Sequence, residues 1–335
     1  MNLHVPRVVF VATGQAAIDW VDVPDPGPDQ IRVRATRTQV SAGSERNALD
    51  SALAAPRPVG YTSIGVVESV GGNVQGYAPG DRVLTMTHHQ GAVLVDVNHP
   101  TEASGYAGHI PAGVSDEEAA FAVLGDVALH GVRRAQPYLG ESVAVFGQGV
   151  VGQLTAYFAA KAGADPVIAI DLDDQRLELA RTSGATHTVN AGREDAVQAV
   201  KDLTHGGARV TFMVTRTPKI LPDCLRATAA GGTVCLSGSP PGMVEIRLQE
   251  ELLRNELNII GNYQRDYPIL PYHRFLWTRP ANRAYVLQLI AREELSVDHL
   301  ISHVVPYLQA PEMYAMIDRG PAGWMSVFFD WSGAS

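Results

Sequence analysis

The sequence predicts an α/β protein in which a β-rich N-terminal domain precedes a doubly wound parallel sheet. The first observation behind this prediction is a strand, glycine turn, helix and second strand over residues 141–171. The second is a regular alternation of short strands and helices after that segment, and the third is a series of short strands and turns before it. Parallel strands that alternate with helices pack as a sheet covered on both faces.

The central segment has the order of elements that a dinucleotide fingerprint requires. An apolar run over 142–146 precedes the glycine turn, and an Ala-rich helical pattern follows it to Ala162. A second apolar run, 167–170, ends in Asp171. The turn has the pattern G-x-G-x-x-G, formed by Gly147, Gln148, Gly149, Val150, Val151 and Gly152.

Each glycine of this turn has a separate physical role. Gly147 permits the tight turn, Gly149 lets the backbone approach a pyrophosphate, and Gly152 lets the helix pack close to the sheet. The free N–H groups at the helix start then face the phosphates. The alternative is a doubly wound domain that binds no nucleotide.

The residues after the second strand indicate which dinucleotide is preferred. Asp171 follows Gly152 by 19 positions, where a carboxylate accepts ribose hydroxyls and repels a 2′-phosphate. We therefore expect NAD(H) rather than NADP(H). Arg176, about one helical turn further on, leaves NADP(H) open. Leu172, Arg176 and Ser237 are also expected to line the cofactor site.

Composition excludes several classes of protein. The 335 residues suffice for two domains, and the 46% hydrophobic and 18% charged residues are ordinary for globular proteins. A net charge of −9 without a basic stripe argues against nucleic acid or an anionic membrane as partner. Without a long apolar segment or a signal-peptide pattern, we expect a cytoplasmic protein. Cys224 and Cys235 are too few for a four-thiolate zinc site.

The N-terminal part is expected to be β-rich, because short alternating runs lie between Pro and Gly turns. Residues 38–46 are small and polar and suggest a loop. Ser115, with Glu118 three residues later, predicts a helix start, and 126–134 has a second helical pattern. The expected strands are Val8–Ala12, Ile18–Val23, Ile31–Ala35, Ser63–Val70 and one that begins at Gly80.

After Asp171 the alternation of strands and helices continues. Expected strands are 188–189, 209–214, 233–237, 258–260, 304–305 and 326–329, and expected helices are 196–203, 220–229, 284–292 and 311–319. Residues 263–281 look irregular. The last strands are expected to return to the first domain, which gives domains of 1–121 with 270–335 and of 122–269.

Several stretches resemble landmarks of the medium-chain dehydrogenase/reductase superfamily, over nearly the whole chain. They read GVVESVG at 65–71, GDRV at 80–83, ALHGVRRA at 128–135 and DDQRLELA at 173–180. The stretch at 128–135 is similar to a helix of polyol dehydrogenases. The resemblance implies a GroES-like β-barrel domain, a Rossmann domain that holds the dinucleotide, and a C-terminus that rejoins the barrel.

The chain departs from the zinc-dependent members at the matched ligand positions. Their CGxD segment matches Ala42-Gly43-Ser44-Glu45, and their GHE segment matches Gly60-Tyr61-Thr62. A third ligand, expected before His130, is matched by Val123 or Gly125, and the four-cysteine lobe is absent. Because zinc needs three or four N, S or O ligands, no zinc is expected. A new site made of His88, His89 and Asp126 is the alternative.

Without zinc, a hydrogen-bond donor or general acid must stabilise the alkoxide that hydride transfer creates. The resemblance places Ser44 at the hydroxyl of the proton relay, Tyr61 in the vacated metal pocket and Asp126 near the nicotinamide. His88 and His89 follow the GDRV strand, on a loop that lines the substrate cleft in relatives. The alternatives are that Ser44 only bonds its own loop, that Tyr61 fills a cavity and that Asp126 caps a helix. One of the two histidines is expected to face solvent.

The leading functional hypothesis is a zinc-independent, NAD(H)-dependent oxidoreductase that interconverts a polyhydroxylated or cyclic secondary alcohol and its ketone. Reduction of an activated C=C or C=N bond is the second hypothesis, and a non-catalytic dinucleotide-binding protein is the third. The partners are a small-molecule substrate and, by resemblance, a second copy paired through a sheet edge near residues 255–280. A substrate lid or an oligomer surface is expected from Tyr263, Arg265, His273, Trp277 and Arg279.

Overall fold

The computed structural model describes residues 2–51, 54–99, 105–263, 277–320 and 322–334. The chain divides into two compact units. Residues Met1–Val123 and Tyr267–Ser335 form the first, called the β-rich unit below, and Leu124–Asp266 form the second, called the Rossmann unit. The helix α2 (Asp116–Ala135) contributes residues to both units.

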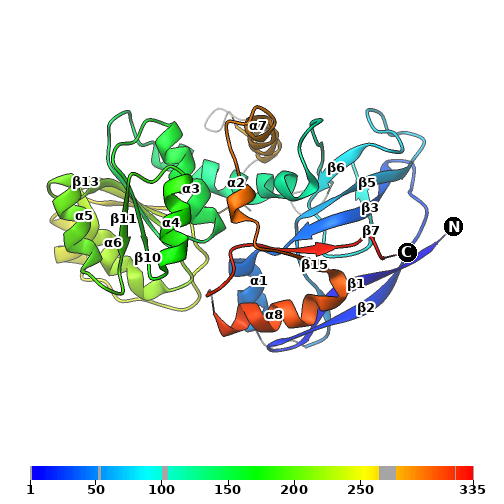
Figure 1. Cartoon of the computed structure of the whole chain (residues 1–335), viewed down its shortest axis with the longest axis horizontal. Helices are drawn as coiled ribbons and strands as arrows, with labels where there is room; N and C mark the ends of the chain where they lie inside the picture. Colours follow the sequence, from blue (N-terminus) through cyan, green and yellow to red (C-terminus); the bar gives the residue numbers. More distant parts are fainter. Residues whose placement is uncertain (1, 52–53, 100–104, 264–276, 321, 335) are drawn as a thin grey trace. The chain divides into compact units, whose positions relative to one another are not determined.

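Two sheets form the β-rich unit (Figure 1). Three strands lie in the order β2-β1-β4, and the larger sheet has the order β15-β16-β3-β5-β6-β8, with β7 paired to β3. The C-terminal strands therefore return to the first part of the chain, as predicted. The strands are β1 (Leu3–Ala12), β2 (Gln15–Val23), β3 (Gln30–Gln39), β4 (Arg57–Pro58), β5 (Ser63–Val70), β6 (Arg82–Thr85), β7 (Ala92–Asp96), β8 (Ala107–His109), β15 (His303–Pro306) and β16 (Val327–Asp330), and the helices are α1 (Ala42–Leu49), α7 (Arg279–Ala291) and α8 (Ala310–Arg319).

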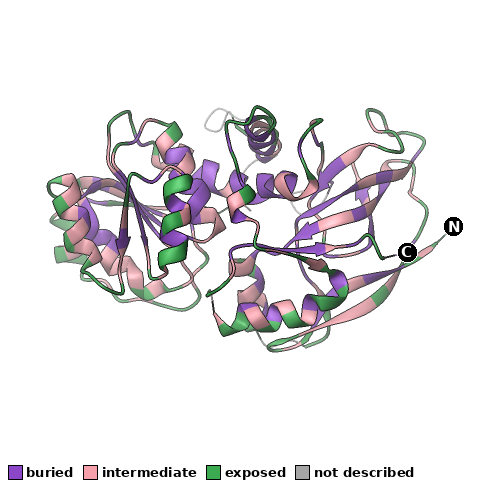
Figure 2. Cartoon of the chain, in the orientation of Figure 1, coloured by how far each residue is buried: buried purple, intermediate pink, exposed green. Residues whose placement is uncertain are grey.

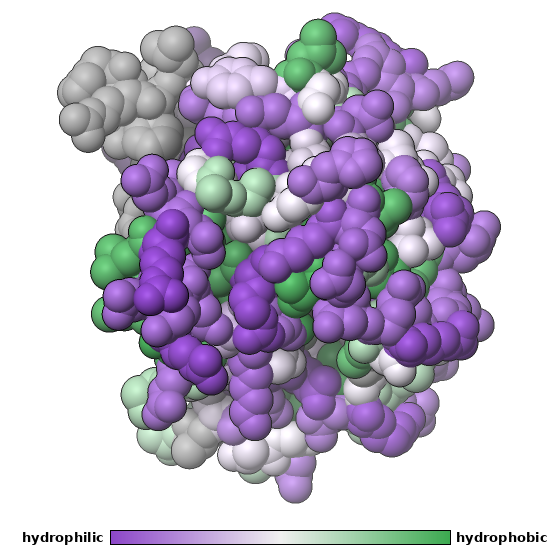
Figure 3. Space-filling model, turned by 90° about the vertical axis from the view of Figure 1, so that its left-hand side faces the viewer, coloured by the Kyte–Doolittle hydropathy of each residue, from purple (hydrophilic) through white to green (hydrophobic). Residues whose placement is uncertain are grey.

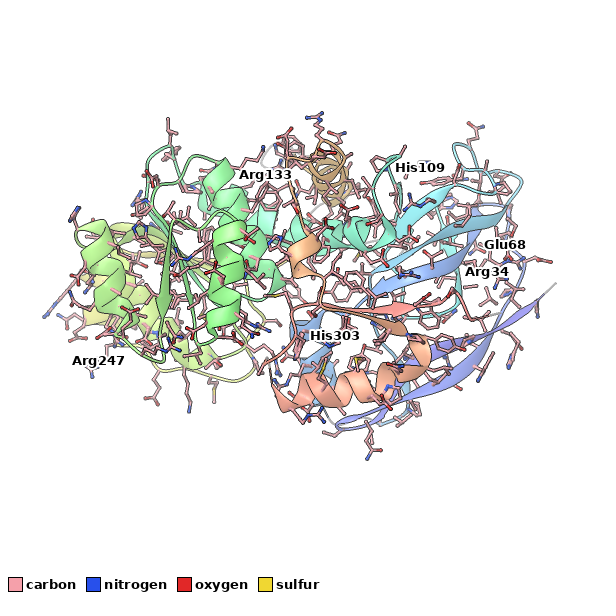
Figure 4. The ribbon with its side chains drawn as sticks, viewed as in Figure 1. Arg34, Glu68, His109, Arg133, Arg247 and His303 are labelled. Atoms are coloured by element: carbon pink, nitrogen blue, oxygen red, sulfur yellow. The ribbon has the colours of Figure 1, made fainter. Side chains whose placement is uncertain are left out.

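The alternation along β3 explains how this unit is stabilised. Ile31 and Val33 are fully buried in one apolar cluster, while Arg34, on the opposite face, meets Glu68 of β5 at 2.8 Å (Figure 4). Burial raises the pKa of Glu68, but the hydrogen bond and charge of Arg34 and the charge of Arg32 outweigh it and hold the pKa below its usual value. The strand thus joins an apolar core to a charged outer face.

The Rossmann unit contains six parallel strands in the order β11-β10-β9-β12-β13-β14. This is the doubly wound order, with the change of direction at β9. Its inner strands β9, β10 and β12 are mostly buried, its edge strand β14 is mostly exposed, and its helices have exposed outer faces (Figure 2). The strands are β9 (Val143–Phe146), β10 (Val167–Asp171), β11 (His187–Asn190), β12 (Ala208–Met213), β13 (Thr228–Leu236) and β14 (Asn258–Gly261), and the helices are α3 (Val150–Lys161), α4 (Asp174–Thr182), α5 (Ala196–Thr204) and α6 (Leu221–Ala227), with a π-helical turn at Leu248–Leu253.

Figure 3 views the end of the Rossmann unit. Hydrophilic residues cover most of that face, and the apolar ones form small separate patches.

Cys224 and Cys235 are both buried, and burial raises the pKa of the Cys235 thiol to about 11. No described helix is long and apolar enough to cross a membrane.

The helix α2 corrects two expectations. It is continuous for 20 residues, so Asp126 lies in its interior and does not cap a helix. The predicted start is confirmed, because the Ser115 N–H donates to Glu118 at 2.8 Å and the Glu118 N–H donates to Ser115 Oγ at 3.2 Å. Asp116, in the first turn, accepts hydrogen bonds from Thr36 at 2.5 Å and from Arg82 Nε at 3.1 Å.

The ends of two segments expected to be irregular, 38–46 and 263–281, belong to helices. Residues 42–49 form α1, because burying Leu49 in the apolar core offsets the weak helix propensity of a Gly- and Ser-containing segment. The helix α7 begins at Arg279, where the Thr278 side chain accepts the Ala281 N–H at 3.2 Å and caps the helix. Arg265 and His273, expected in a lid or oligomer surface, lie outside the described residues.

Candidate functional site

In the Rossmann unit, the turn after β9 explains the glycines of the fingerprint. Gly147 has φ of +99°, and a Cβ there would lie 2.5 Å from the Val214 carbonyl oxygen. A Cβ on Gly152 would lie 1.9 Å from the Gly147 carbonyl oxygen, so the helix and turn pack too closely for a side chain. A Cβ on Gly149 would meet only the Arg176 guanidinium, at 3.7 Å. Gly149 therefore leaves open space next to the backbone.

The start of α3 at this turn suits an anion. Its N-cap is Gly149, which supplies no side chain to the free N–H groups, and its first turn contains no acidic residue. Unpaired N–H groups and the helix dipole favour a negative group there. Gly149, Val150, Val151 and Gly152 thus fit a pyrophosphate.

Asp171 ends β10 beside this turn. Its carboxylate accepts the backbone N–H of Gln148 at 2.6 Å, of Leu172 at 2.7 Å and of Asp173 at 3.1 Å. These bonds fix the carboxylate next to the glycine turn, while the Leu172 side chain beside it is 72% exposed. An exposed apolar side chain next to a fixed carboxylate suits a nucleoside, whose base is apolar on its faces and whose ribose donates hydrogen bonds.

Arg176 brings a buried cation to the same place. Burial lowers the pKa of Arg176, although the charges of Asp171 and Asp173 oppose this shift. Gln153, which the sequence did not single out, donates to the Arg176 carbonyl at 2.8 Å and to the Gln148 carbonyl at 3.3 Å. Gln153 thereby ties the glycine turn to α4.

Two further residues expected at the cofactor have side chains in other contacts. The Gln148 side chain is buried and donates to the Val145 carbonyl at 2.8 Å, so only its backbone is available to a ligand. Ser237 Oγ accepts a hydrogen bond from Asn262 Nδ2 at 3.1 Å, and that amide also donates to the Val127 carbonyl of α2 at 2.9 Å. The roles of Gln148 and Ser237 toward a cofactor stay predictions.

In the β-rich unit, the structure brings together Ser44, Tyr61 and a third hydroxyl, that of Ser41. The Tyr61 hydroxyl donates to Ser41 Oγ, and Ser44 Oγ lies 3.5 Å from both other hydroxyl oxygens. Ser44 is exposed, Tyr61 is half-buried and Ser41 is buried. The three form a hydroxyl cluster that leads from the interior to the surface.

Behind this cluster lies a buried carboxylate that the sequence did not single out as functional. Glu45 is 3% exposed and accepts hydrogen bonds from the Ser41 N–H at 2.8 Å and from the Tyr314 hydroxyl at 2.5 Å. His89 Nε2 lies 3.2 Å from the other side of Glu45 Oε2. The resemblance matches Glu45 to the acidic residue of the CGxD segment, which is a sequence signal for this carboxylate. No local sequence pattern indicates that Tyr314 is its partner.

The remaining candidates have different environments. His88 is exposed and His89 fully buried, which confirms that one of the pair faces solvent. His88 Nδ1 lies 2.8 Å from the Gly60 carbonyl oxygen. Asp126 is fully buried and belongs to the Rossmann unit. Whether Asp126, His88 or His89 takes part in catalysis stays a prediction.

Among the described residues of the β-rich unit, the side chains at the matched positions 42 and 61 are not the usual ligands of zinc. Ala42 begins α1, and the Tyr61 oxygen is hydrogen-bonded to Ser41, at the two positions where relatives are expected to supply ligands. Within the described ranges, no three His, Cys, Asp or Glu side chains gather closely enough to hold a metal ion. His88, His89 and Asp126 do not form such a group.

Known proteins share this organisation. Residues 150–274 match the family model described as zinc-binding dehydrogenase. The chain is 27% identical to L-threonine 3-dehydrogenase of Anaeromyxobacter sp. (strain Fw109-5), over 92% of this chain and 94% of that one. It is 25% identical to sorbitol dehydrogenase of Gallus gallus over 93% of both chains.

A solved structure extends the similarity over both units. A protein of Sinorhizobium meliloti 1021, assigned as a zinc-binding dehydrogenase and solved with NADP bound, is 25% identical with a TM-score of 0.82. The match covers 98% of this chain and 99% of that one. Together with the two-sheet first unit, the doubly wound sheet and the glycine turn, these similarities support the medium-chain dehydrogenase/reductase superfamily. The chain is an oxidoreductase with the two-domain fold of that superfamily.

Proposed function

We propose that this chain is a zinc-independent, NAD(H)-dependent dehydrogenase that interconverts a polyhydroxylated secondary alcohol and its ketone. The observation that carries the proposal is the hydroxyl cluster of Ser41, Ser44 and Tyr61, in which Tyr61 stands where relatives are expected to supply a metal ligand. Two similar proteins are named for hydroxylated substrates, threonine and sorbitol, which supports an alcohol as substrate here.

The residues of the Rossmann unit fit a nicotinamide dinucleotide, which when bound supplies or accepts the hydride. The uncapped start of α3 and the open space at Gly149 would hold its pyrophosphate. Asp171 favours NAD(H), because a fixed carboxylate accepts ribose hydroxyls and repels a 2′-phosphate. Arg176 offsets part of that repulsion, so the preference is a matter of degree rather than an exclusion.

Within the β-rich unit, Tyr61 is the group proposed to move the proton. In the direction of reduction, the Tyr61 hydroxyl turns its proton from Ser41 Oγ to the substrate, and its O–H bond breaks as the proton goes to the carbonyl oxygen and hydride reaches the carbonyl carbon. The developing negative charge then lies on the phenolic oxygen, where the Ser41 and Ser44 hydroxyls can donate to it. Because Ser44 is exposed, it connects this oxygen to water, from which the proton is restored.

Turnover with a panel of polyols and NAD tests the proposal by the absorbance of NADH. We expect turnover that persists after exhaustive dialysis against a chelator, with less than one metal ion per ten chains by elemental analysis. Tyr61→Phe should lower kcat about 10²- to 10⁴-fold, the usual contribution of a general acid, and Ser44→Ala should lower it less. Only a few-fold effect from both variants would remove Tyr61 and Ser44 as proton donors.

The same panel separates this proposal from the other two hypotheses. Turnover of enones or imines but not of alcohols would identify a reductase of activated double bonds. Dinucleotide binding by calorimetry with no turnover of any substrate class would identify a non-catalytic binding protein. Stoichiometric zinc, lost together with activity on chelation, would contradict zinc independence.

We also propose that two copies pair through β14. This strand ends the parallel sheet, and Asn258, Ile259 and Gly261 on it are exposed. An edge strand with unpaired backbone groups and an exposed isoleucine is suited to pair with an identical strand.

A further inference from the structure

The starting observation is that Ser41 begins α1 without capping it. Ser41 is the N-cap residue, yet its side chain makes no capping hydrogen bond. A serine at this position ordinarily accepts an N–H of the first turn through its Oγ. The serine that begins α2 does so, because Ser115 Oγ accepts the Glu118 N–H at 3.2 Å. Ser41 Oγ instead accepts the Tyr61 hydroxyl.

Glu45 explains why the Ser41 hydroxyl is free for Tyr61. Its Oε1 accepts the Ser41 N–H at 2.8 Å from four residues along the chain, one position beyond the acidic residue of a capping box, and Ser41 Oγ makes no capping bond in return. The backbone of Ser41 is thus held from the carboxylate side, and its hydroxyl turns toward Tyr61. Without this acceptor, Ser41 can rotate its Oγ onto the first-turn N–H groups, and Tyr61 then loses its partner.

Glu45 also influences the position of Tyr61 through His89. The His89 N–H donates to the Val59 carbonyl at 2.8 Å, and its ring packs against Gly60. A Cβ on Gly60, whose φ is +92°, would lie 2.6 Å from that ring. Because His89 Nε2 is held by Glu45 at 3.2 Å, the ring that shapes the backbone before Tyr61 is itself oriented by Glu45.

Tyr314 completes the set of donors around Glu45. It is 1% exposed and donates to Oε2 at 2.5 Å from α8, an element far along the chain. Burial raises the pKa of Tyr314 well above its usual value, and Glu45 raises it further, so the hydroxyl stays protonated as a donor. Both carboxylate oxygens therefore have fixed partners, and neither faces solvent.

We propose that Glu45, oriented by His89 and Tyr314, is the positioning residue that keeps Ser41 Oγ and Tyr61 paired; its catalytic consequence rests on the function proposed above. In this arrangement His89 acts through Glu45 and the Gly60 backbone and does not touch substrate. Glu45, three residues after the matched ligand position Ala42, thus supports Tyr61 as the proton donor in this chain.

The test is a double-mutant cycle of Glu45→Gln with Tyr61→Phe. An amide cannot replace the carboxylate, because its NH₂ must face either the Ser41 N–H or the His89 and Tyr314 donors. We expect Glu45→Gln to lower kcat at least tenfold in the native background, with the substrate KM and NAD affinity within about threefold. In the Tyr61→Phe background it should lower kcat less than about twofold, because the positioned group is already gone.

A matched control is Thr38→Val. Thr38 Oγ1 accepts Trp331 Nε1 at 2.9 Å, so this variant removes another buried hydrogen bond of the β-rich unit without touching Ser41 or Tyr61. It should lower the melting temperature without lowering kcat. Equal kcat losses for Glu45→Gln in both Tyr61 backgrounds would mean that Glu45 only stabilises the fold, and would overturn the proposal.

Two further measurements keep the outcome decisive. If Glu45→Gln does not fold, Tyr314→Phe removes one donor and keeps the ring, and the same cycle with Tyr61→Phe applies. If the native protein turns over no substrate, the proposed function is contradicted, but the positioning role of Glu45 is not. The crystal structure of Glu45→Gln then decides, because Ser41 Oγ should leave Tyr61 and accept a first-turn N–H, and an unmoved Ser41 would overturn the positioning role.

Discussion

At the turn after β9, the three fingerprint glycines differ in what an added methyl group would contact. We expect Gly149→Ala to change the free energy of unfolding by less than about 0.5 kcal/mol, because its methyl group meets only Arg176 at 3.7 Å. It should nevertheless weaken NAD binding at least about tenfold, since the methyl group fills the space for the pyrophosphate. Chemical denaturation and calorimetry measure the two effects separately.

Gly152→Ala is the matched variant for that prediction. Its methyl group would lie 1.9 Å from the Gly147 carbonyl oxygen, so it should destabilise the fold by about 1–3 kcal/mol even without cofactor. Equal stability losses in the two variants, or unchanged NAD affinity in Gly149→Ala, would contradict the separate roles assigned to these glycines.

We propose that the Asp171 carboxylate is the main determinant of cofactor preference. Asp171→Asn removes the charge that opposes a 2′-phosphate and keeps one oxygen for the Leu172 N–H. We expect the ratio of kcat/KM for NAD over NADP to fall at least about tenfold, which is 1.4 kcal/mol. Asp174→Asn is the control, because this exposed residue pairs with Arg193 and makes no contact with the glycine turn. A ratio that stays constant in Asp171→Asn would contradict the assignment.

The sequence predicts residues well where function depends on neighbours in the chain. The fingerprint and Asp171 lie within 25 residues, and local periodicity defines the strands between them. The environment of Glu45 is different, because Tyr314 is 269 residues away and His89 is 44 away. Only the folded structure brings these residues together, so the sequence could suggest Ser44, Tyr61 and an acidic residue at position 45, but not the partners of that carboxylate.

At the scale of elements, helix boundaries follow tertiary packing more than local composition. The segment 38–46 looks like a loop because small polar residues dominate it, but the burial of Glu45 and Leu49 anchors residues 42–49 as α1. In α2, two predicted helical pieces join into one, since a single Gly125 costs only about 1 kcal/mol relative to alanine. The predicted strands overlap observed strands, because Pro and Gly turns mark where they end, but β7 and β8 were not predicted.

The first turn of α2 offers a test of how this helix is held. Asp116→Ala removes the acceptor of both Arg82 and Thr36 and should lower the free energy of unfolding by about 1–3 kcal/mol. Glu118→Ala removes only the capping box and should cost about 0.5–1 kcal/mol. Urea denaturation of both variants measures the difference. A smaller loss for Asp116→Ala than for Glu118→Ala would show that the cap, not the tie to the strands, sets the stability.

For the whole molecule, the exposed edge of the parallel sheet predicts the oligomeric state. If β14 pairs with its copy, Ile259→Lys places two cations at the contact and should convert a dimer to a monomer. Leu139→Lys alters a residue that is 87% exposed away from this strand and should leave the mass unchanged. Light scattering coupled to gel filtration measures both, and an unchanged dimer in Ile259→Lys would place the interface elsewhere.

One buried histidine, His130, predicts how the stability of the fold depends on pH. Burial and the charges of Arg134 and Arg133 lower the pKa of His130 to about 4, whereas the unfolded chain has the ordinary value of about 6.5. Between these values the unfolded state binds a proton that the folded state does not, so the free energy of unfolding falls as pH decreases from about 6.5 to 4. The part due to His130 is on the order of 1–3 kcal/mol.

Replacing the imidazole isolates this contribution. His130→Gln should flatten the decline between pH 6.5 and 4, even if the variant is less stable at pH 7, because glutamine binds no proton in either state. His187→Gln removes an exposed histidine of the same unit and should leave the slope as it is. If His130→Gln and the native protein lose stability in parallel over this range, the buried histidine is not the source, and carboxylates such as Glu68 must carry the acid sensitivity.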